Sequence, residues 1–182
     1  MKTVVVVHTG PATVQPIKQQ FQAILPEVRV INLMDDSLLN DVIAAGRLTD
    51  AVSARILSYM RMGEEMGACA VLNACSSVGE AATAARSLVS IPIVKIDETM
   101  AETAVAHGPR VGVVATVRTT LEPTVRLIRA KAAAQRREVE IVEALADGAF
   151  QALLDGEAQR HDRIVNQTIE SLSGRVEIGS AS

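Results

Sequence analysis

One cysteine of the sequence stands where a thiol can do chemistry. Cys75 lies in the motif NACSS and leads into Ser77-Val78-Gly79-Glu80, an S-x-x-E capping box typical of a helix start. The N–H groups and the dipole of a helix amino terminus stabilise a thiolate, the reactive form of a thiol that otherwise ionises near pH ~8.5. Cys75 is therefore a candidate base or nucleophile. The alternative is a small buried apolar residue.

Three loops rich in Thr, Ser and Asn could hold a carboxylate ligand. They are Thr9 to Ala12, Asn73 to Ser77 and Thr116 to Thr120, and each follows a predicted strand. Ligands of open parallel sheets bind beyond the carboxyl ends of the strands, and free amides at helix starts suit an anion. The competing role of these loops is ordinary helix capping.

Other polar side chains have roles that the sequence leaves open. His8 ends the first predicted strand and is either an accessory acid, base or orienting group or a structural histidine. Arg118 could pair with a carboxylate or stay in solvent. Asp35-Asp36-Ser37 is better explained as a helix cap than as part of a site. Cys69, within ACAVL, has no polar neighbours and is expected to be buried.

Composition favours a small-molecule partner. A net charge of -3 and only 2% aromatic residues argue against nucleic acid, which needs clustered basic residues and stacking rings. The longest apolar run, near Val111 to Ala115, is too short for a bilayer, and no signal sequence opens the chain, so we expect a cytoplasmic protein without a membrane partner. CxxC, GxGxxG and GxxxxGK[ST] patterns are absent, so neither a metal nor a nucleotide is predicted.

Short β-branched segments alternate with helical ones along the chain, which predicts an α/β fold built on parallel sheets. The predicted strands are Thr3 to Val7, Val28 to Leu33, Cys69 to Leu72, Ile91 to Ile96, Val111 to Ala115, Val139 to Val142 and Val176 to Ile178. The predicted helices are Thr13 to Leu25, Thr49 to Met66, Val78 to Val89, Glu98 to His107, Leu121 to Arg136 and Glu157 to Leu172.

An internal repeat divides these elements into two lobes. The segment VVVVHTGPATVQP (Val4 to Pro16) aligns without a gap on VGVVATVRTTLEP (Val111 to Pro123). We therefore expect two pseudo-symmetric lobes, each a parallel sheet flanked by helices: residues 1–108, which carry Cys75, and residues 109–182. If the lobes face each other, their polar loops meet at one cleft.

The same alignment, continued along the chain, places Ser182 opposite Cys75 and the segment IGSAS opposite VLNAC. The second lobe is then expected to be truncated, incomplete at its C-terminus, because it has no counterpart of Ser76 to His107. An unfinished sheet exposes apolar surface. Either the chain is a fragment or a partner covers that surface, and we expect a homo-oligomer.

Four segments together resemble the aspartate/glutamate racemase superfamily, which includes hydantoin racemases and arylmalonate decarboxylases. They are HTGPATVQP, VLNACSSVGE, IPIVKIDETMAETAV and VGVVATVRTTLEPT, in the family's order and with its lobe duplication. The resemblance spans essentially the whole chain. It implies a site that needs no cofactor, in which thiols on opposite faces of the substrate remove and return an α-proton.

The resemblance also implies roles for single residues. Cys75 matches the first thiol, and Ser182 stands where the second is expected. A hydroxyl is a far weaker base than a thiolate, which puts two-base racemisation in doubt. Glu98 lies in a shared segment as a possible accessory residue. The expected substrate-binding residues are Thr9, Ser76, Ser77, Thr116, Thr119 and Thr120, to which the loop after the third strand adds Asn73.

The sequence thus predicts an isomerase, an amino-acid racemase or epimerase independent of pyridoxal phosphate, that acts on a small carboxylate or amino acid through Cys75. Two alternatives stay open. One is a single-cysteine decarboxylase or cis-trans isomerase of a small dicarboxylate. The other is a non-catalytic binding protein or an inactive fragment that keeps the cleft without the chemistry.

Overall fold

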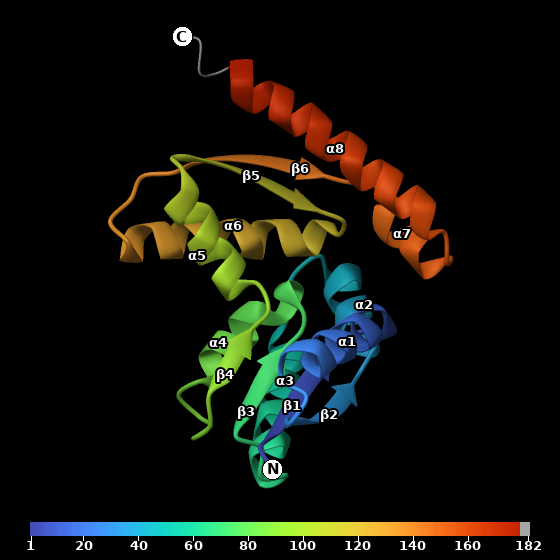
Figure 1. The fold of residues 1–182 in the computed structure, drawn as a ribbon, viewed down its shortest axis with the longest axis vertical. Helices are drawn as coiled ribbons and strands as arrows, with labels where there is room; N and C mark the ends of the chain where they lie inside the picture. The colour runs from blue at the N-terminus through green and yellow to red at the C-terminus, as the bar shows by residue number, and fades with distance from the viewer. Residues whose placement is uncertain (179–182) are drawn as a thin grey trace. The chain divides into compact units, whose positions relative to one another are not determined.

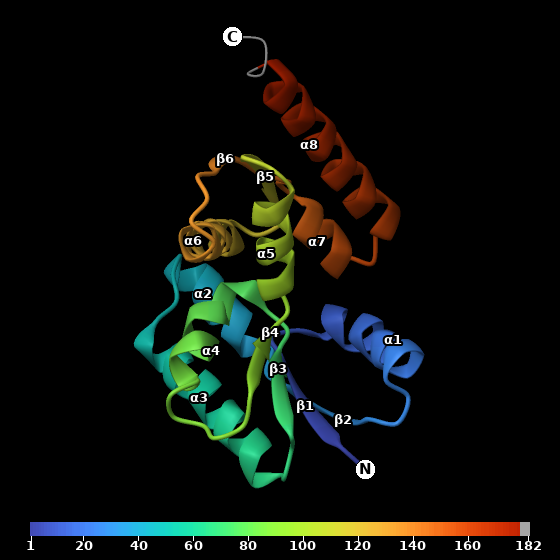
Figure 2. The ribbon, with the colours of Figure 1, turned by 60° about the vertical axis from the view of Figure 1, so that its left-hand side comes forward.

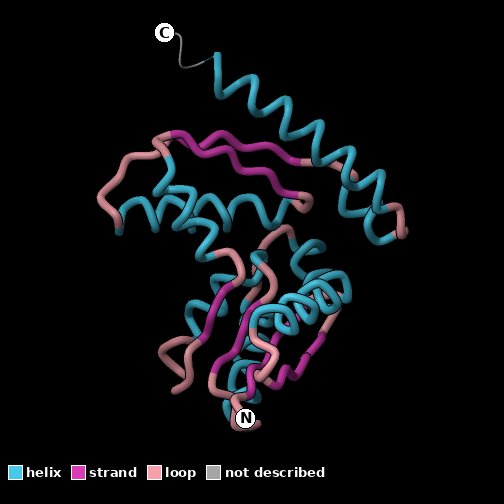
Figure 3. Tube along the Cα trace, viewed as in Figure 1, coloured by secondary structure: helices cyan, strands magenta, loops and turns pink. Residues whose placement is uncertain are grey.

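The computed structural model describes the backbone of residues 1–178 and the side chains of residues 1–173. It contains two compact units, Met1–Asp97 and a second that begins at Glu98 (Figure 1). In both units strands alternate with helices along the chain, as the tube in Figure 3 shows. The predicted α/β class is therefore confirmed. No helix in the described part of the chain is long and apolar enough to cross a membrane.

The first unit is built on a four-stranded parallel sheet in the order β2-β1-β3-β4. Its central strand carries a run of four valines, of which Val5, Val6 and Val7 are at most 1% exposed. Such a continuous apolar run is typical of a strand that is covered on both faces. The strands are β1 (Thr3–His8), β2 (Arg29–Met34), β3 (Ala70–Asn73) and β4 (Ile93–Lys95).

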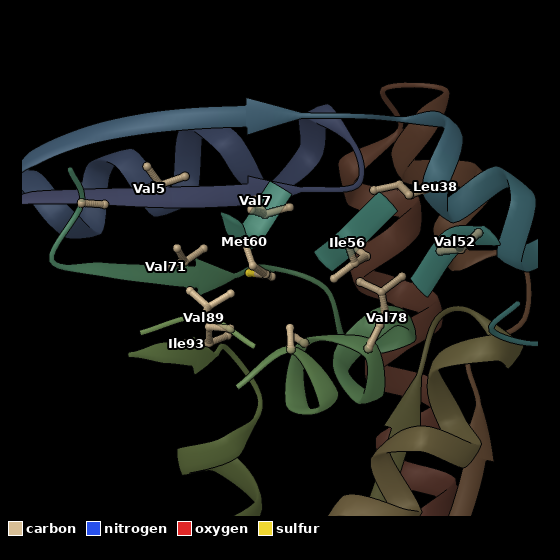
Figure 4. Packing of buried hydrophobic residues seen from close by; sticks show 14 of the residues in the cluster. Val5, Val7, Leu38, Val52, Ile56, Met60, Val71, Val78, Val89 and Ile93 are labelled. Atoms are coloured by element: carbon tan, nitrogen blue, oxygen red, sulfur yellow. The ribbon is translucent and has the colours of Figure 1, made fainter. Parts of the chain in front are cut away.

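Helices cover both faces of this sheet (Figure 2). On one face α2 (Ser37–Ala45), α3 (Asp50–Glu65) and α4 (Gly79–Ala85) enclose the main apolar core, whose packing Figure 4 shows. The helix α1 (Val14–Ile24), entered through the 3-10 turn η1 (Pro11–Thr13), packs on the opposite face. A second 3-10 turn, η2 (Ser76–Val78), runs directly into α4.

Close packing of α3 on the sheet depends on a glycine. A Cβ atom at Gly63 would lie 2.6 Å from Cγ2 of Val71 and 3.4 Å from Cβ of Val5. Because the helix backbone touches the strands there, α3 and the sheet are fixed in one register. Ile56 and Met60, on the same helix, are fully buried in the resulting core.

The second unit contains a two-stranded parallel sheet, β5 (Arg110–Ala115) and β6 (Glu140–Leu145). Helices α5 (Glu98–His107) and α6 (Arg118–Ala134) pack on one face of β5. On its other face lies α8 (Ala158–Ile178), where Leu172 packs so tightly that a Cβ atom at Gly112 would lie 2.8 Å from its Cδ2. The short helix α7 (Ala149–Leu154) precedes α8.

The position of α5 sets the boundary between the units. The sequence places this helix in a first lobe that ends at residue 108, whereas the structure groups it with the second unit. Lys131 of α6 forms ion pairs with Glu98 and Glu102 of α5, and Arg137 donates to the carbonyl of Val105. These contacts hold α5 against α6 and the residues that follow it. Because they join residues about thirty positions apart, local sequence patterns do not predict them.

The predicted strand at Val176 to Ile178 is wrong, because α8 continues to Ile178. The apolar residues Leu172 and Val176 are four apart, which is helical spacing, and the helix runs on through Ser173 and Gly174 without a break. Ser182, which the repeat aligned with Cys75, lies outside the described residues. Helices α2 and α7 were not predicted.

The motif Asp35-Asp36-Ser37 is a helix cap, as expected. One carboxylate oxygen of Asp35 accepts hydrogen bonds from the amide (3.1 Å) and the hydroxyl (2.6 Å) of Ser37, the first residue of α2. The other oxygen accepts from Tyr59 (2.7 Å) and from Arg55, which also pairs with Asp41. Burial raises the pKa of Asp35, but the hydrogen bonds from Ser37, Arg55 and Tyr59 outweigh it and lower this pKa to about 2.

We predict that Asp35→Asn lowers the free energy of unfolding at neutral pH by about 1–2 kcal/mol, discounted because Arg55 is partly exposed. The folded pKa lies below the unfolded one, so this stability is present above the unfolded pKa and is lost as pH falls toward 2. Urea unfolding at neutral and acid pH measures both effects. Asp41→Asn is the control and should cost under about 0.5 kcal/mol. An equal loss in the two variants would contradict the prediction.

Candidate functional site

Three strands of the first unit end side by side at one edge of the sheet. The amide of Ala74 donates to the carbonyl of Val7 (3.0 Å), and the amide of Ile96 donates to the carbonyl of Asn73 (3.1 Å). Since β1, β3 and β4 are parallel, the loops that follow them leave the sheet at this same edge. The structure thereby brings together five of the predicted site residues: Thr9, Asn73, Cys75, Ser76 and Ser77.

Cys75 lies between the end of β3 and the turn η2. Its backbone is extended (φ -147°, ψ 122°), and it occupies the position that precedes the first helical residue. The side chain is half-buried and contacts the main apolar core, so the thiol is neither sealed inside the protein nor fully in solvent. The first amides of a helical turn have no partners within the helix and point toward a group placed before it. The geometry therefore suits a thiolate or a bound anion.

Asn73 holds the backbone of this turn. Its side chain is fully buried, and its Nδ2 group donates to the carbonyl of Cys75 at 2.8 Å. The Oδ1 atom is buried and has no hydrogen-bond partner among the described residues. The sequence predicts Asn73 as a substrate-binding residue, but the structure gives it a contact that positions Cys75.

Thr9, Ser76 and Ser77 differ in their exposure to solvent. Thr9 follows β1 and is 6% exposed, and Ser77 is 2% exposed within η2. Ser76 is half-buried beside Cys75. A ligand that approaches Cys75 from solvent therefore meets Ser76 and the amides of η2 before it meets the other two hydroxyls.

His8 is a fully buried histidine with both ring nitrogens hydrogen-bonded. Nε2 lies 2.9 Å from Oδ1 of Asn32, which can only accept, so Nε2 carries the proton and Nδ1 of the neutral ring accepts from the hydroxyl of Thr13 at 2.8 Å. Burial lowers the pKa of His8, against an opposing effect of the bond to Asn32. His8, the last residue of β1, thus links this strand to Asn32 of β2 and to Thr13 at the end of η1.

The Thr loop of the second unit starts at the end of β5. Thr116 is half-buried, and α6 begins at Arg118, so that Thr119 and Thr120 lie in its first turn. The hydroxyl of Thr119 is buried without a partner among the described residues, and the carbonyl of Thr120 accepts from the hydroxyl of Thr124 at 2.8 Å. Arg118 is exposed. The polar groups of this loop surround the first turn of a helix, as those of η2 do in the first unit.

Glu98 is the first residue of α5, and an ion pair of 2.8 Å joins it to Lys131 of α6. Hydrogen bonds to Glu102 and Glu98 raise the pKa of Lys131. This pairing gives Glu98 a structural role within the second unit.

Cys69 does not follow the expectation of burial. It precedes β3, at the amino end of the strand, and its side chain is exposed. Cys75 follows β3 at the other end. The two thiols are therefore on opposite edges of the sheet, and a single cysteine remains at the carboxyl edge.

Sequence reasoning missed Lys95 and Asp97 at this edge. Both are 6% exposed, and Nζ of Lys95 lies 4.0 Å from Oδ1 of Asp97. The signal was present, because two charged residues interrupt the apolar segment IPIVKID. Among the side chains that the structure describes, no group of three or more His, Cys, Asp or Glu is arranged to hold a metal ion.

Comparison with known proteins relates this arrangement to one family. A family model described as Asp/Glu/Hydantoin racemase matches residues 4–179. Among curated proteins, no sequence matches the chain.

Three solved structures have a similar fold. A glutamate racemase isoform from Bacillus anthracis is 15% identical with a TM-score of 0.72, covering 94% of this chain and 64% of that one. The glutamate racemase of Francisella tularensis, in complex with D-glutamate, is 16% identical with a TM-score of 0.61 over 85% and 57% of the two chains. The aspartate racemase of Picrophilus torridus is 12% identical with a TM-score of 0.63 over 94% and 74%. The chain thus spans less than two thirds of either glutamate racemase.

We predict that His8→Leu lowers the free energy of unfolding by about 1–3 kcal/mol, because it leaves Asn32 and Thr13 without their buried partner. The folded pKa of His8 is lowered, so the stability that it contributes is present above the unfolded pKa of 6.5 and falls as pH drops below it. Urea titrations on both sides of this pH should show that the variant lacks this part of the acid dependence. His107→Leu, an exposed histidine, is the control, and the prediction fails if it behaves alike.

Proposed function

Because this chain belongs to the Asp/Glu/Hydantoin racemase family, we propose that it is a cofactor-independent isomerase of a small amino acid or related carboxylate. The observation that carries the proposal is the position of Cys75. Its half-buried thiol precedes the first turn of a helix, at the edge of the sheet where three strand ends meet. Helix starts are where thiolates are stabilised, and strand ends are where α/β proteins bind ligands.

In the proposed reaction the Cys75 thiolate removes the α-proton of the bound substrate. The electron pair left at the α-carbon moves onto the substrate carboxylate, which becomes enediolate-like, and the proton is held on sulfur. Backbone amides of η2 and the hydroxyls of Ser76, Ser77 and Thr9 would stabilise this charge. We propose the same task for Thr116, Thr119 and Thr120.

Racemisation also requires an acid on the opposite face of the substrate. Ser182 is our candidate from the repeat, although a hydroxyl is a weak acid-base group at neutral pH. One observation favours a second candidate function. Cys69 lies at the amino end of β3, so Cys75 is the single thiol at the carboxyl edge of the sheet. A single-thiol isomerase or decarboxylase of a small dicarboxylate would deliver its proton to one face only.

The proposal predicts Cys75-dependent exchange of an α-proton. Incubation with each enantiomer of aspartate and glutamate in deuterated water, followed by NMR, should show exchange that Cys75→Ser reduces by at least about 10²-fold, the size of a lost general base. Cys69→Ser should stay within about twofold of the wild type, since that thiol is at the far end of the strand. Exchange that is absent, or that survives Cys75→Ser, would refute a thiol-dependent isomerase of these substrates.

Chiral analysis of the same samples separates the two candidate functions. A racemase produces the opposite enantiomer with deuterium at the α-carbon, whereas a one-face enzyme returns the deuteron with retention and no inversion. Malonate derivatives and maleate, tested alongside, report decarboxylation or cis-trans isomerisation. A protein that turns over none of these while binding one of them is a binding protein.

A further inference from the structure

Lys95 and Asp97 form a buried ion pair that the proposed reaction does not use. The side chains are 6% and 7% exposed, and Nζ of Lys95 lies 4.0 Å from Oδ1 of Asp97. The same Oδ1 atom is buried and has no hydrogen-bond partner in the described part of the chain. Burying two charges costs several kcal/mol per ion unless they are closely paired and hydrogen-bonded, so this arrangement is a poor source of stability.

The pair lies next to the residue that holds Cys75. In the parallel register of β3 and β4, Asn73 is the direct partner of Lys95, as Val71 is of Ile93. Val71 and Ile93 belong to the core beneath α3 and α4. Alternation along the strands therefore places Asn73 and Lys95 on that same face of the sheet, toward the segment from η2 to α4.

Lys95 and Asp97 contact this segment at Gly79. A Cβ atom added there would lie 3.1 Å from Cε and 3.5 Å from Nζ of Lys95, and 3.7 Å from Oδ2 of Asp97. The first of these distances is shorter than ordinary van der Waals contact, so the glycine lets the ion pair lie directly on the backbone at the start of α4. Asn73 meanwhile bonds the carbonyl of Cys75 at 2.8 Å.

We propose that Asn73, Lys95 and Asp97 are positioning residues that fix the segment Cys75–Gly79 from its two ends. Asn73 holds the first residue, and the ion pair holds the last. The thiol and the amides of η2 then keep one orientation with respect to each other and to the charges of Lys95 and Asp97. The inference deepens the proposed function, because it concerns the thiol that the isomerase would use.

The test measures the reactivity of the Cys75 thiol, which does not depend on any substrate. In a Cys69→Ser background, which removes the exposed second thiol, the rate of alkylation by iodoacetamide is followed across the pH range around ~8.5. Lys95→Met leaves a buried carboxylate and should shift the alkylation midpoint to higher pH. Asp97→Asn leaves a buried ammonium and should shift it to lower pH, each by about half a unit or more.

Opposite shifts of the alkylation midpoint show that Cys75 is held close to both charges. Simple loosening of the fold would move the midpoint of both variants in one direction. The double variant Lys95→Met/Asp97→Asn keeps the fold measurable, because replacing both members of a buried pair is often tolerated. It should melt near the parent and yet alkylate Cys75 at a rate changed by about threefold or more. Gly79→Ala, which presses on Cε of Lys95, should also change that rate. Lys131→Met, an ion-paired lysine of the second unit, is the matched control.

Alkylation profiles that stay within twofold of the parent in the folded double variant and in Gly79→Ala would overturn the inference. Shifts of the same sign in both single variants would do so as well. Because neither result depends on turnover, a protein that exchanges no α-proton can still support the positioning role, and an active isomerase can still refute it.

Discussion

The parallel pairing of β1, β3 and β4 is the constraint on which the site depends. Parallel strands end at the same edge, so the residues after each of them become neighbours even though they are far apart in the sequence. Gly63 fixes α3 against Val5 and Val71, and α4 follows from η2 on the same face. The place of Cys75 is therefore set by the core of the unit and not by its loop alone.

Local pattern was enough to predict most of the elements. Six of the seven predicted strands are present, because β-branched runs between turn residues have few other ways to fold. The segment Val176 to Ile178 is predicted as a strand and is helical, because two apolar residues around Glu177 fit the end of a helix equally well. The packing of α5 with α6 is supported by Lys131 and Arg137, whose partners lie about thirty residues earlier in the chain. Hydrophobic periodicity describes neighbours along one element and does not predict such contacts.

The candidate site was predictable in position and less so in the roles of its members. Strand ends and a capping motif located Cys75, Ser76 and Ser77. The hydrogen bond from Asn73 to the Cys75 carbonyl, and those that occupy both ring nitrogens of His8, depend on the three-dimensional fold and have no signal in the sequence. Lys95 and Asp97 are not predicted as site residues, because charged residues in an apolar segment are usually solvated. Their burial follows from the register of β4 with β3.

The placement of the two cysteines at opposite ends of β3 determines which products form when an oxidant reacts with the Cys75 thiol. Cys69 and Cys75 are six positions apart on either side of β3, which puts their Cα atoms on the order of 20 Å apart at the rise of an extended chain, whereas a disulfide needs Cα atoms within about 7 Å. Peroxide acting on Cys75 would therefore produce a sulfenic acid without a resolving thiol in its own unit. Recovery would depend on a thiol from another molecule, and further oxidation to the sulfinic acid would be irreversible for the protein alone.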